Sequence, residues 1–220
     1  GPSHPNTLTM QLNAISNLAA QERIGEAVAL QRQMEPQVLA WLGAELYSTE
    51  AATVRRQLVA SQSTYQDVAL SLALHPNLAC YVPIAHGGTD LLAENPVQID
   101  REVVLAKMKP LLEDPSILKI GHNLKYDMIV LARAYAATGG VTIAPFDDTI
   151  LMSFDLDAGL HGHGMDELAA THLSHTCIAF KDVVGTGKSQ RSFNEIDLKA
   201  ATHYAAEDAD VTLRLWRRFK

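Results

Sequence analysis

The chain has 220 residues, a net charge of −7, 47% hydrophobic residues and 20% charged residues, which is typical of a globular domain with a sizeable core. No apolar run reaches the roughly 18 residues of a membrane span, and the N-terminus lacks a signal pattern, so we expect no membrane partner. The negative charge argues against a general nucleic-acid coating protein, but not against a nuclease whose carboxylates hold divalent cations.

Two cysteines, Cys80 and Cys177, are too few for a disulfide framework, and neither has a metal-ligand spacing. We therefore expect a reducing, cytoplasmic environment. Residues 1–7 begin with Gly-Pro-Ser-His and are interpreted as the remnant of an expression tag with a disordered start. Residues 8–66 are predicted to be a helical N-terminal segment, because their apolar residues recur every three to four positions and turn residues are scarce.

From residue 67 to residue 220 the pattern changes to alternating strands and helices, which predicts an α/β domain with a hairpin at one edge of its sheet. Asp100 is predicted to cap a helix. The other expected elements, in chain order, are strands at 68–74 and 79–84, a strand at 117–120, a helix at 124–136, a strand at 143–146, a helix capped within 147–149, and helices at 164–173 and 195–218.

Three side chains could act together on a phosphodiester. Tyr204 and Asp208 are four residues apart, so they share one face of the predicted C-terminal helix. Asp127 lies early in the helix that follows a central strand, four residues after Asn123. If the two helices converge, metal ions held by the carboxylates could activate a water and stabilise the leaving oxygen. A single Asp on a helix is more often a solvated side chain, so spacing alone leaves both interpretations open.

Several ordered motifs after residue 67 resemble one family. They are Lys109-Pro110-Leu111-Leu112-Glu113-Asp114, Lys119 through Asp127 (KIGHNLKYD), Phe146-Asp147-Asp148-Thr149, His163 through Leu168 (HGMDEL), Gly185 through Gln190 (GTGKSQ) and Tyr204 through Thr212. Over about 150 residues the chain resembles the 3′–5′ exonuclease (proofreading) domain of family A DNA polymerases such as DNA polymerase I. This resemblance implies a ribonuclease H-like fold of the DnaQ type, a mixed sheet flanked by helices.

The resemblance also implies residue roles and partners. Asp127 and Asp208 would hold Mg²⁺ or Mn²⁺ in a two-ion site, and Tyr204 would orient the attacking water. Asn123 would contact the substrate near its 3′ end, and Lys188 and Arg191 would lie near the single strand. The implied partner is the 3′ end of single-stranded DNA, and a polymerase domain in the full-length protein is left open.

One motif of the family is not visible. Its first strand carries an Asp-x-Glu pair, but the corresponding position here falls at residues 52–58, which contain two arginines and no acid. Glu45 is the nearest substitute ligand, although a Glu on a helix surface is the ordinary interpretation. We therefore expect the 3′–5′ exonuclease activity to be weak or absent. The alternatives are a catalytically dead fold that serves as a scaffold or strand-binding module, and an enzyme like ribonuclease D that acts on RNA.

Four histidines lie close together in the sequence, at positions 161, 163, 172 and 175. They could be assembled into a metal site. However, His172 and His175 have no Cys or carboxylate at ligand spacing, so the sequence favours ordinary surface or core histidines.

Overall fold

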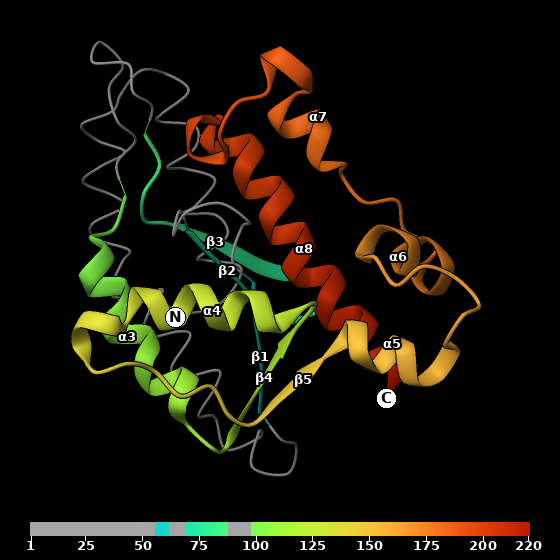
Figure 1. The fold of residues 1–220 in the computed structure, drawn as a ribbon, viewed down its shortest axis with the longest axis horizontal. Coiled ribbons are helices and arrows are strands. Elements are labelled where there is room, and N and C mark those ends of the chain that lie inside the picture. Colours follow the sequence, from blue (N-terminus) through green and yellow to red (C-terminus); the bar gives the residue numbers. More distant parts are fainter. Residues whose placement is uncertain (1–55, 62–68, 88–97) are drawn as a thin grey trace, which may run out of the picture. The chain divides into compact units, whose positions relative to one another are not determined.

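The structure is a computed structural model, and it describes three stretches of the chain: residues 56–61, 69–87 and 98–220. The expectations for residues 1–55, including Glu45, lie outside the described residues. One compact unit spans Gln57–Lys220. It contains a five-stranded sheet in the order β3-β2-β1-β4-β5 (Figure 1). Within the described stretches, no helix is long and apolar enough to cross a membrane.

The central strand of the sheet is β1 (Arg56–Ser61). It pairs antiparallel with β2 (Ala69–His75), with Val59 opposite Ala73 and Ser61 opposite Ser71. The helical prediction for residues 8–66 is therefore wrong at these six positions. Gln, Leu and Ala in this segment favour a helix locally, but pairing with a strand on each side outweighs that preference. The sheet thus begins before residue 67.

The predicted hairpin is confirmed. Strands β2 and β3 (Leu78–Pro83) pair antiparallel, and Asn77 in the turn between them has a positive φ of 63°. Every residue of β2 except the last is buried. This agrees with the continuous apolar run that predicted a strand covered on both faces.

The next three elements are α3 (Arg101–Glu113), β4 (Ile117–Gly121) and α4 (Leu124–Ala134). Asp100 caps α3, as predicted, and accepts hydrogen bonds from the first backbone amides of that helix. All five residues of β4 are buried, including Lys119. The Lys119 ammonium donates to three backbone carbonyls, those of Asp114, Ile117 and Ala144, which satisfies its three donors. Burial lowers the pKa of Lys119.

Strand β5 is Phe146–Asp148 and pairs parallel with β4, so the predicted strand at 143–146 is displaced. Pro145 has no N–H to donate to a ladder, and its carbonyl accepts instead from the Lys119 amide. Asp148 is the last residue of β5, and its carboxylate accepts hydrogen bonds from the backbone amides of Asn123, Leu124 and Ile150. Asp148 therefore caps two helices, α4 and α5.

The remaining helices are α5 (Thr149–Asp157), α6 (Met165–Leu173), α7 (Phe180–Val184) and α8 (Leu198–Phe219). The 3₁₀ turns are η2 (Ala136–Thr138), η3 (Gly187–Ser189) and η4 (Phe193–Glu195). The helices near 164–173 and 195–218 are confirmed, and α7 was not predicted. Helix α8 contacts β2, β3 and β4, and α5, α6 and α7 pack against it (Figure 1). Ala73, Leu118, Ile120, Ala209 and Leu213 form a core cluster between α8 and the sheet.

The double cap at Asp148 gives a stability prediction. We expect Asp148→Ala to lower the free energy of unfolding by about 2–3 kcal/mol, because each lost helix cap costs roughly 0.5–2 kcal/mol. Urea unfolding measures the change. Asp155→Ala, at an exposed position of α5, is the matched control and should change stability by less than about 0.5 kcal/mol. Equal stability of the two variants would contradict the cap.

Candidate functional site

Tyr204 and Asp208 lie one turn apart on α8, as predicted. A side-chain hydrogen bond joins the Tyr204 hydroxyl to the Asp208 carboxyl, and both side chains are half-buried. The pKa of Asp208 is raised to about 7, chiefly by burial; the Tyr204 hydrogen bond opposes this rise, and the charges of Glu207 and Asp166 add to it. Burial, together with the negative charge of Asp208, also raises the pKa of Tyr204. Without a cation the site therefore disfavours the Asp208 carboxylate.

Two acidic neighbours of this pair, Asp166 and Glu207, were not identified from the sequence as site residues. Asp166, in the first turn of α6, acts electrostatically on both Asp208 and Tyr204 and hydrogen-bonds the Cys177 thiol. Glu207 accepts from the Ile178 amide at 2.7 Å and lies 2.9 Å from His175 Nε2. The sequence signal for Asp166 was its place in the matched motif at 163–168. The association of Glu207 with His175 has no local signal, because 32 residues separate them.

Asp127 is buried in the first turn of α4, with 5% of its surface exposed. The helix starts from Asn123, whose left-handed backbone conformation (φ 62°) turns the chain out of β4. The Asn123 side chain is exposed, while its backbone amide is held by Asp148 at 2.9 Å. The local fold therefore fixes where Asp127 and Asn123 lie relative to the end of β4.

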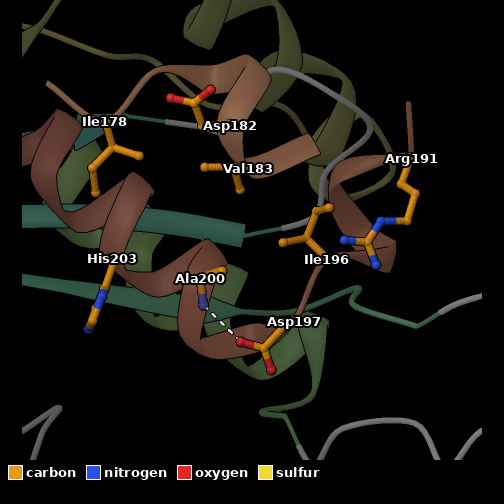
Figure 2. Close-up of a pocket in the computed structure, with 8 residues that line it drawn as sticks. All are labelled: Ile178, Asp182, Val183, Arg191, Ile196, Asp197, Ala200 and His203. Carbon is orange, nitrogen blue, oxygen red and sulfur yellow. Dashed lines mark hydrogen bonds between the residues drawn. The ribbon is translucent and has the colours of Figure 1, made fainter. Parts of the chain in front are cut away.

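A hollow of about 380 Å³ lies beside the N-terminal part of α8 (Figure 2). Its lining combines apolar side chains with two acids and two basic groups: Ile178, Asp182, Val183, Arg191, Ile196, Asp197, Ala200 and His203. Ala200 and Tyr204 are four residues apart, so the hollow borders the helix face that carries Tyr204. Arg191 lines this hollow together with Ala200. The predicted Lys188 lies in the 3₁₀ turn η3 of the same loop.

Two groups of at least three His, Cys, Asp or Glu side chains could hold a metal ion within the described part of the chain. They are Asp157 with His161 and His172, and His175 with Cys177 and Glu207. The sequence favoured ordinary surface or core histidines and predicted neither group; it did not predict that His172 lies near Asp157, or that His175 and Cys177 lie near Glu207. Their partners come from other elements and do not show up as a sequence spacing. Neither Asp127 nor Asp208 belongs to such a group among these residues.

The fold is that of a DnaQ-like exonuclease, as predicted. NrnC of Brucella melitensis superposes with a TM-score of 0.54 at 18% identity, over 76% of this chain and 72% of that protein. Escherichia coli RNase D, an exoribonuclease involved in structured RNA processing, gives a TM-score of 0.50 at 16% identity, over 80% of this chain and 42% of that one. At these identities the likeness establishes the fold.

The sequence gives the family. Residues 59–220 match the family DNA_pol_A_exo1, described as 3′-5′ exonuclease, and the chain belongs to this family. It is 51% identical over 144 residues to DNA polymerase I of Rhizobium leguminosarum, covering 63% of this chain and 14% of that protein. It is also 46% identical over 152 residues to DNA polymerase I of Pseudomonas aeruginosa, covering 68% and 16%. The chain thus spans about one seventh of these relatives.

The raised pKa of Asp208 predicts a pH-dependent stability in the metal-free chain. Between pH about 4 and 7 the folded state holds a proton on Asp208 that the unfolded state has lost, so the free energy of unfolding falls as pH rises through this window. Asp208→Asn removes this penalty. The free energy of unfolding of the variant, relative to that of the unaltered chain, should therefore increase as pH rises from 4 to 8, by at most about 4 kcal/mol.

Urea unfolding at several pH values, in the presence of a chelator, measures the gain. Asp155→Asn is the control, and its free energy of unfolding should equal that of the unaltered chain at every pH. An Asp208→Asn profile parallel to that of the unaltered chain would show that Asp208 is not destabilised by burial.

Proposed function

We propose that this chain is a 3′–5′ exonuclease domain of the DNA polymerase I family in which hydrolysis of the 3′-terminal phosphodiester of DNA is weak or absent. One observation carries the proposal: the central strand β1 is in place, but its sequence Arg-Gln-Leu-Val-Ala-Ser contains no carboxylate. The fold has kept the strand on which the family's Asp-x-Glu pair is expected, without the acids that would share two metal ions.

The remaining acids favour Mg²⁺ or Mn²⁺. Asp127, Asp208 and Asp166 supply oxygen donors, which hard divalent cations prefer. Asp208 is destabilised as a carboxylate by burial and by neighbouring acids, and a cation would compensate that charge. Ile120 at the end of β4 packs with Ala209 of α8, and α4 begins shortly after β4. This packing supports the convergence of Asp127 and Asp208 on one cleft, which remains a prediction.

In this proposal Asp208 and Asp127 hold the cation, and Tyr204 orients the attacking water through its hydroxyl. A cation held there would lower the pKa of its bound water and stabilise the leaving oxygen. Asn123, Lys188 and Arg191 contact the single strand near its 3′ end. Brucella melitensis NrnC has been solved with bound Mg²⁺, which supports a divalent ion in this fold. The acid that the family's two ions would share is absent from the sequence of β1.

Restoring the acids tests the proposal directly. Positions 59 and 61 pair with Ala73 and Ser71, and Ala73 packs with Ala209 of α8, the residue that follows Asp208 in the chain. We expect Val59→Asp with Ser61→Glu to raise Mg²⁺-dependent digestion of single-stranded DNA at least about 100-fold, roughly 2.7 kcal/mol of transition-state stabilisation. The two positions lie on one face of the strand.

The control places the same two acids on the other face, by Leu58→Asp with Ala60→Glu, and should leave the activity low. Circular dichroism verifies that both double variants are folded. Any cleavage by the unaltered or restored chain should disappear in Asp208→Ala. Robust metal-dependent digestion by the unaltered chain would contradict the proposal, and would point to an acid outside the described residues, Glu45 or Glu50 first.

The second candidate function, a non-catalytic strand-binding module, is favoured by the hollow at Arg191. Its apolar lining suits a nucleobase, and the guanidinium suits a phosphate. If the chain binds single-stranded DNA there, Arg191→Ala should weaken binding several-fold and reduce its salt dependence by about one phosphate contact.

Fluorescence anisotropy at several salt concentrations measures both effects. Arg133→Ala, at the exposed C-terminal end of α4, is the matched control and should bind as the unaltered chain does. Equal affinities for the two variants would exclude the hollow as a strand-binding surface. Comparing DNA with RNA of the same sequence tests the ribonuclease alternative.

A further inference from the structure

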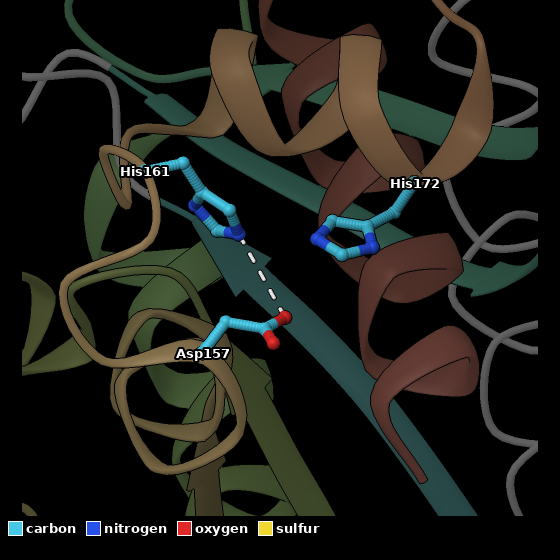
Figure 3. A group of neighbouring side chains, drawn as sticks. All are labelled: Asp157, His161 and His172. Carbon is cyan, nitrogen blue, oxygen red and sulfur yellow. Dashed lines mark ion pairs between the residues drawn. The ribbon is translucent and has the colours of Figure 1, made fainter.

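Asp157, His161 and His172 form a compact side-chain group (Figure 3). Asp157 ends α5, His161 lies in the turn that follows, and His172 lies in the last turn of α6. One ligand atom from each lies within 4.8 Å of the other two. Figure 3 shows the three side chains directed toward one another from three separate segments.

His161 is held in the tautomer that binds a metal ion. Its Nδ1 lies 2.7 Å from the carbonyl oxygen of Gly162. A carbonyl only accepts, so Nδ1 carries the proton and Nε2 keeps a free lone pair. Nε2 is buried and has no hydrogen-bond partner among the described residues, and it lies 3.7 Å from Asp157 Oδ2. A backbone carbonyl bonded to the second nitrogen is the usual support of a metal-binding histidine.

His172 gives an independent second observation. Its Nε2 is also buried without a hydrogen-bond partner within the described stretches. The ring packs edge-on against Phe219 at 5.1 Å and against His161 at 5.6 Å between centroids. Buried polar atoms normally have partners, so two unpartnered imidazole nitrogens next to one carboxylate indicate a site that lacks its ligand.

The turn that carries His161 is fixed by the surrounding structure. The Gly162 amide donates to Glu167 Oε1 at 2.9 Å. The Leu160 amide donates to the carbonyl of Asp157. Because these contacts join the turn to α5 and α6, the three candidate ligands are positioned before any ion binds.

We propose that Asp157, His161 and His172 bind one divalent transition-metal ion of the zinc class, with water as the remaining ligand. Two imidazoles and one carboxylate suit Zn²⁺, whereas Mg²⁺ prefers oxygen donors alone. The site is distinct from the proposed nuclease site, because Phe219 beside His172 lies about 16 Å along α8 from Asp208. The ion joins the end of α5 to α6 and so has a structural role beyond the proposed function.

Competition with a chromophoric chelator tests the proposal by titrating Zn²⁺ into the full chain. We expect one tight equivalent in the unaltered chain. His161→Gln and His172→Gln should each lose at least about tenfold in affinity, while His75→Gln, at the exposed end of β2, should lose nothing. His175→Gln with Cys177→Ser distinguishes the second candidate group. Loss in that double variant alone, or equal binding in all variants, would overturn the assignment.

Thermal unfolding gives a second readout. Zn²⁺ should raise the melting temperature of the unaltered chain, because an ion that binds only the folded state stabilises it. The increase should be absent in His172→Gln, whose circular dichroism without Zn²⁺ should match the unaltered chain. Asp208→Ala should keep the full increase, so failure of the nuclease proposal leaves this result intact. A Zn²⁺-dependent increase that persists in His172→Gln would overturn the site.

Discussion

The position of the candidate site depends on one carboxylate, that of Asp148. It ends β5 and receives amides from the start of α4 and from the start of α5. Two helix N-termini meet there, and each favours a negative charge. Because β4 and β5 are parallel neighbours, this cap fixes the direction in which α4 leaves the sheet. Asp127 lies in the first turn of that helix, so its place in the fold is set by a residue that has no proposed part in chemistry.

Next to the Asp148 cap, polar contacts join the end of β4 to the start of α5. Thr149 is fully buried, and its hydroxyl donates to the Gly121 carbonyl and lies 2.9 Å from His122 Nδ1. A Cβ at Gly121 would collide with the Leu124 side chain at 2.6 Å. These short-range contacts explain why the motif from Lys119 to Asp127 could be recognised in the sequence. The backbone conformation of this loop requires particular residues at these positions, in addition to any requirement that a substrate sets.

Most of the fold could be predicted because its elements carry local signals. The buried run of β2, the cap at Asp100 and the helical periodicity of α8 were sufficient for their elements. Two strands were misplaced, for different reasons. The residues of β1 favour a helix locally, and they form a strand because they pair with β2, which follows it in the chain, and with β4, which lies far from it in sequence. β5 was displaced because its pairing with β4 begins at Phe146, after Pro145, and the register of that pairing has no local sequence signal.

The residues of the candidate site also fall into two groups: those that local sequence signals predict and those that only the structure reveals. Tyr204 and Asp208 could be predicted because helical spacing and family resemblance agree, whereas Asp166 and Glu207 come together with them through packing of α6 and the following loop on α8. The histidine groups needed the structure for the same reason. The sheet requires backbone pairing from β1, and pairing does not depend on side-chain charge, so a central strand can stay in place without its acids. Fold and catalysis therefore place separate demands on this strand, and a chain can satisfy the first while failing the second.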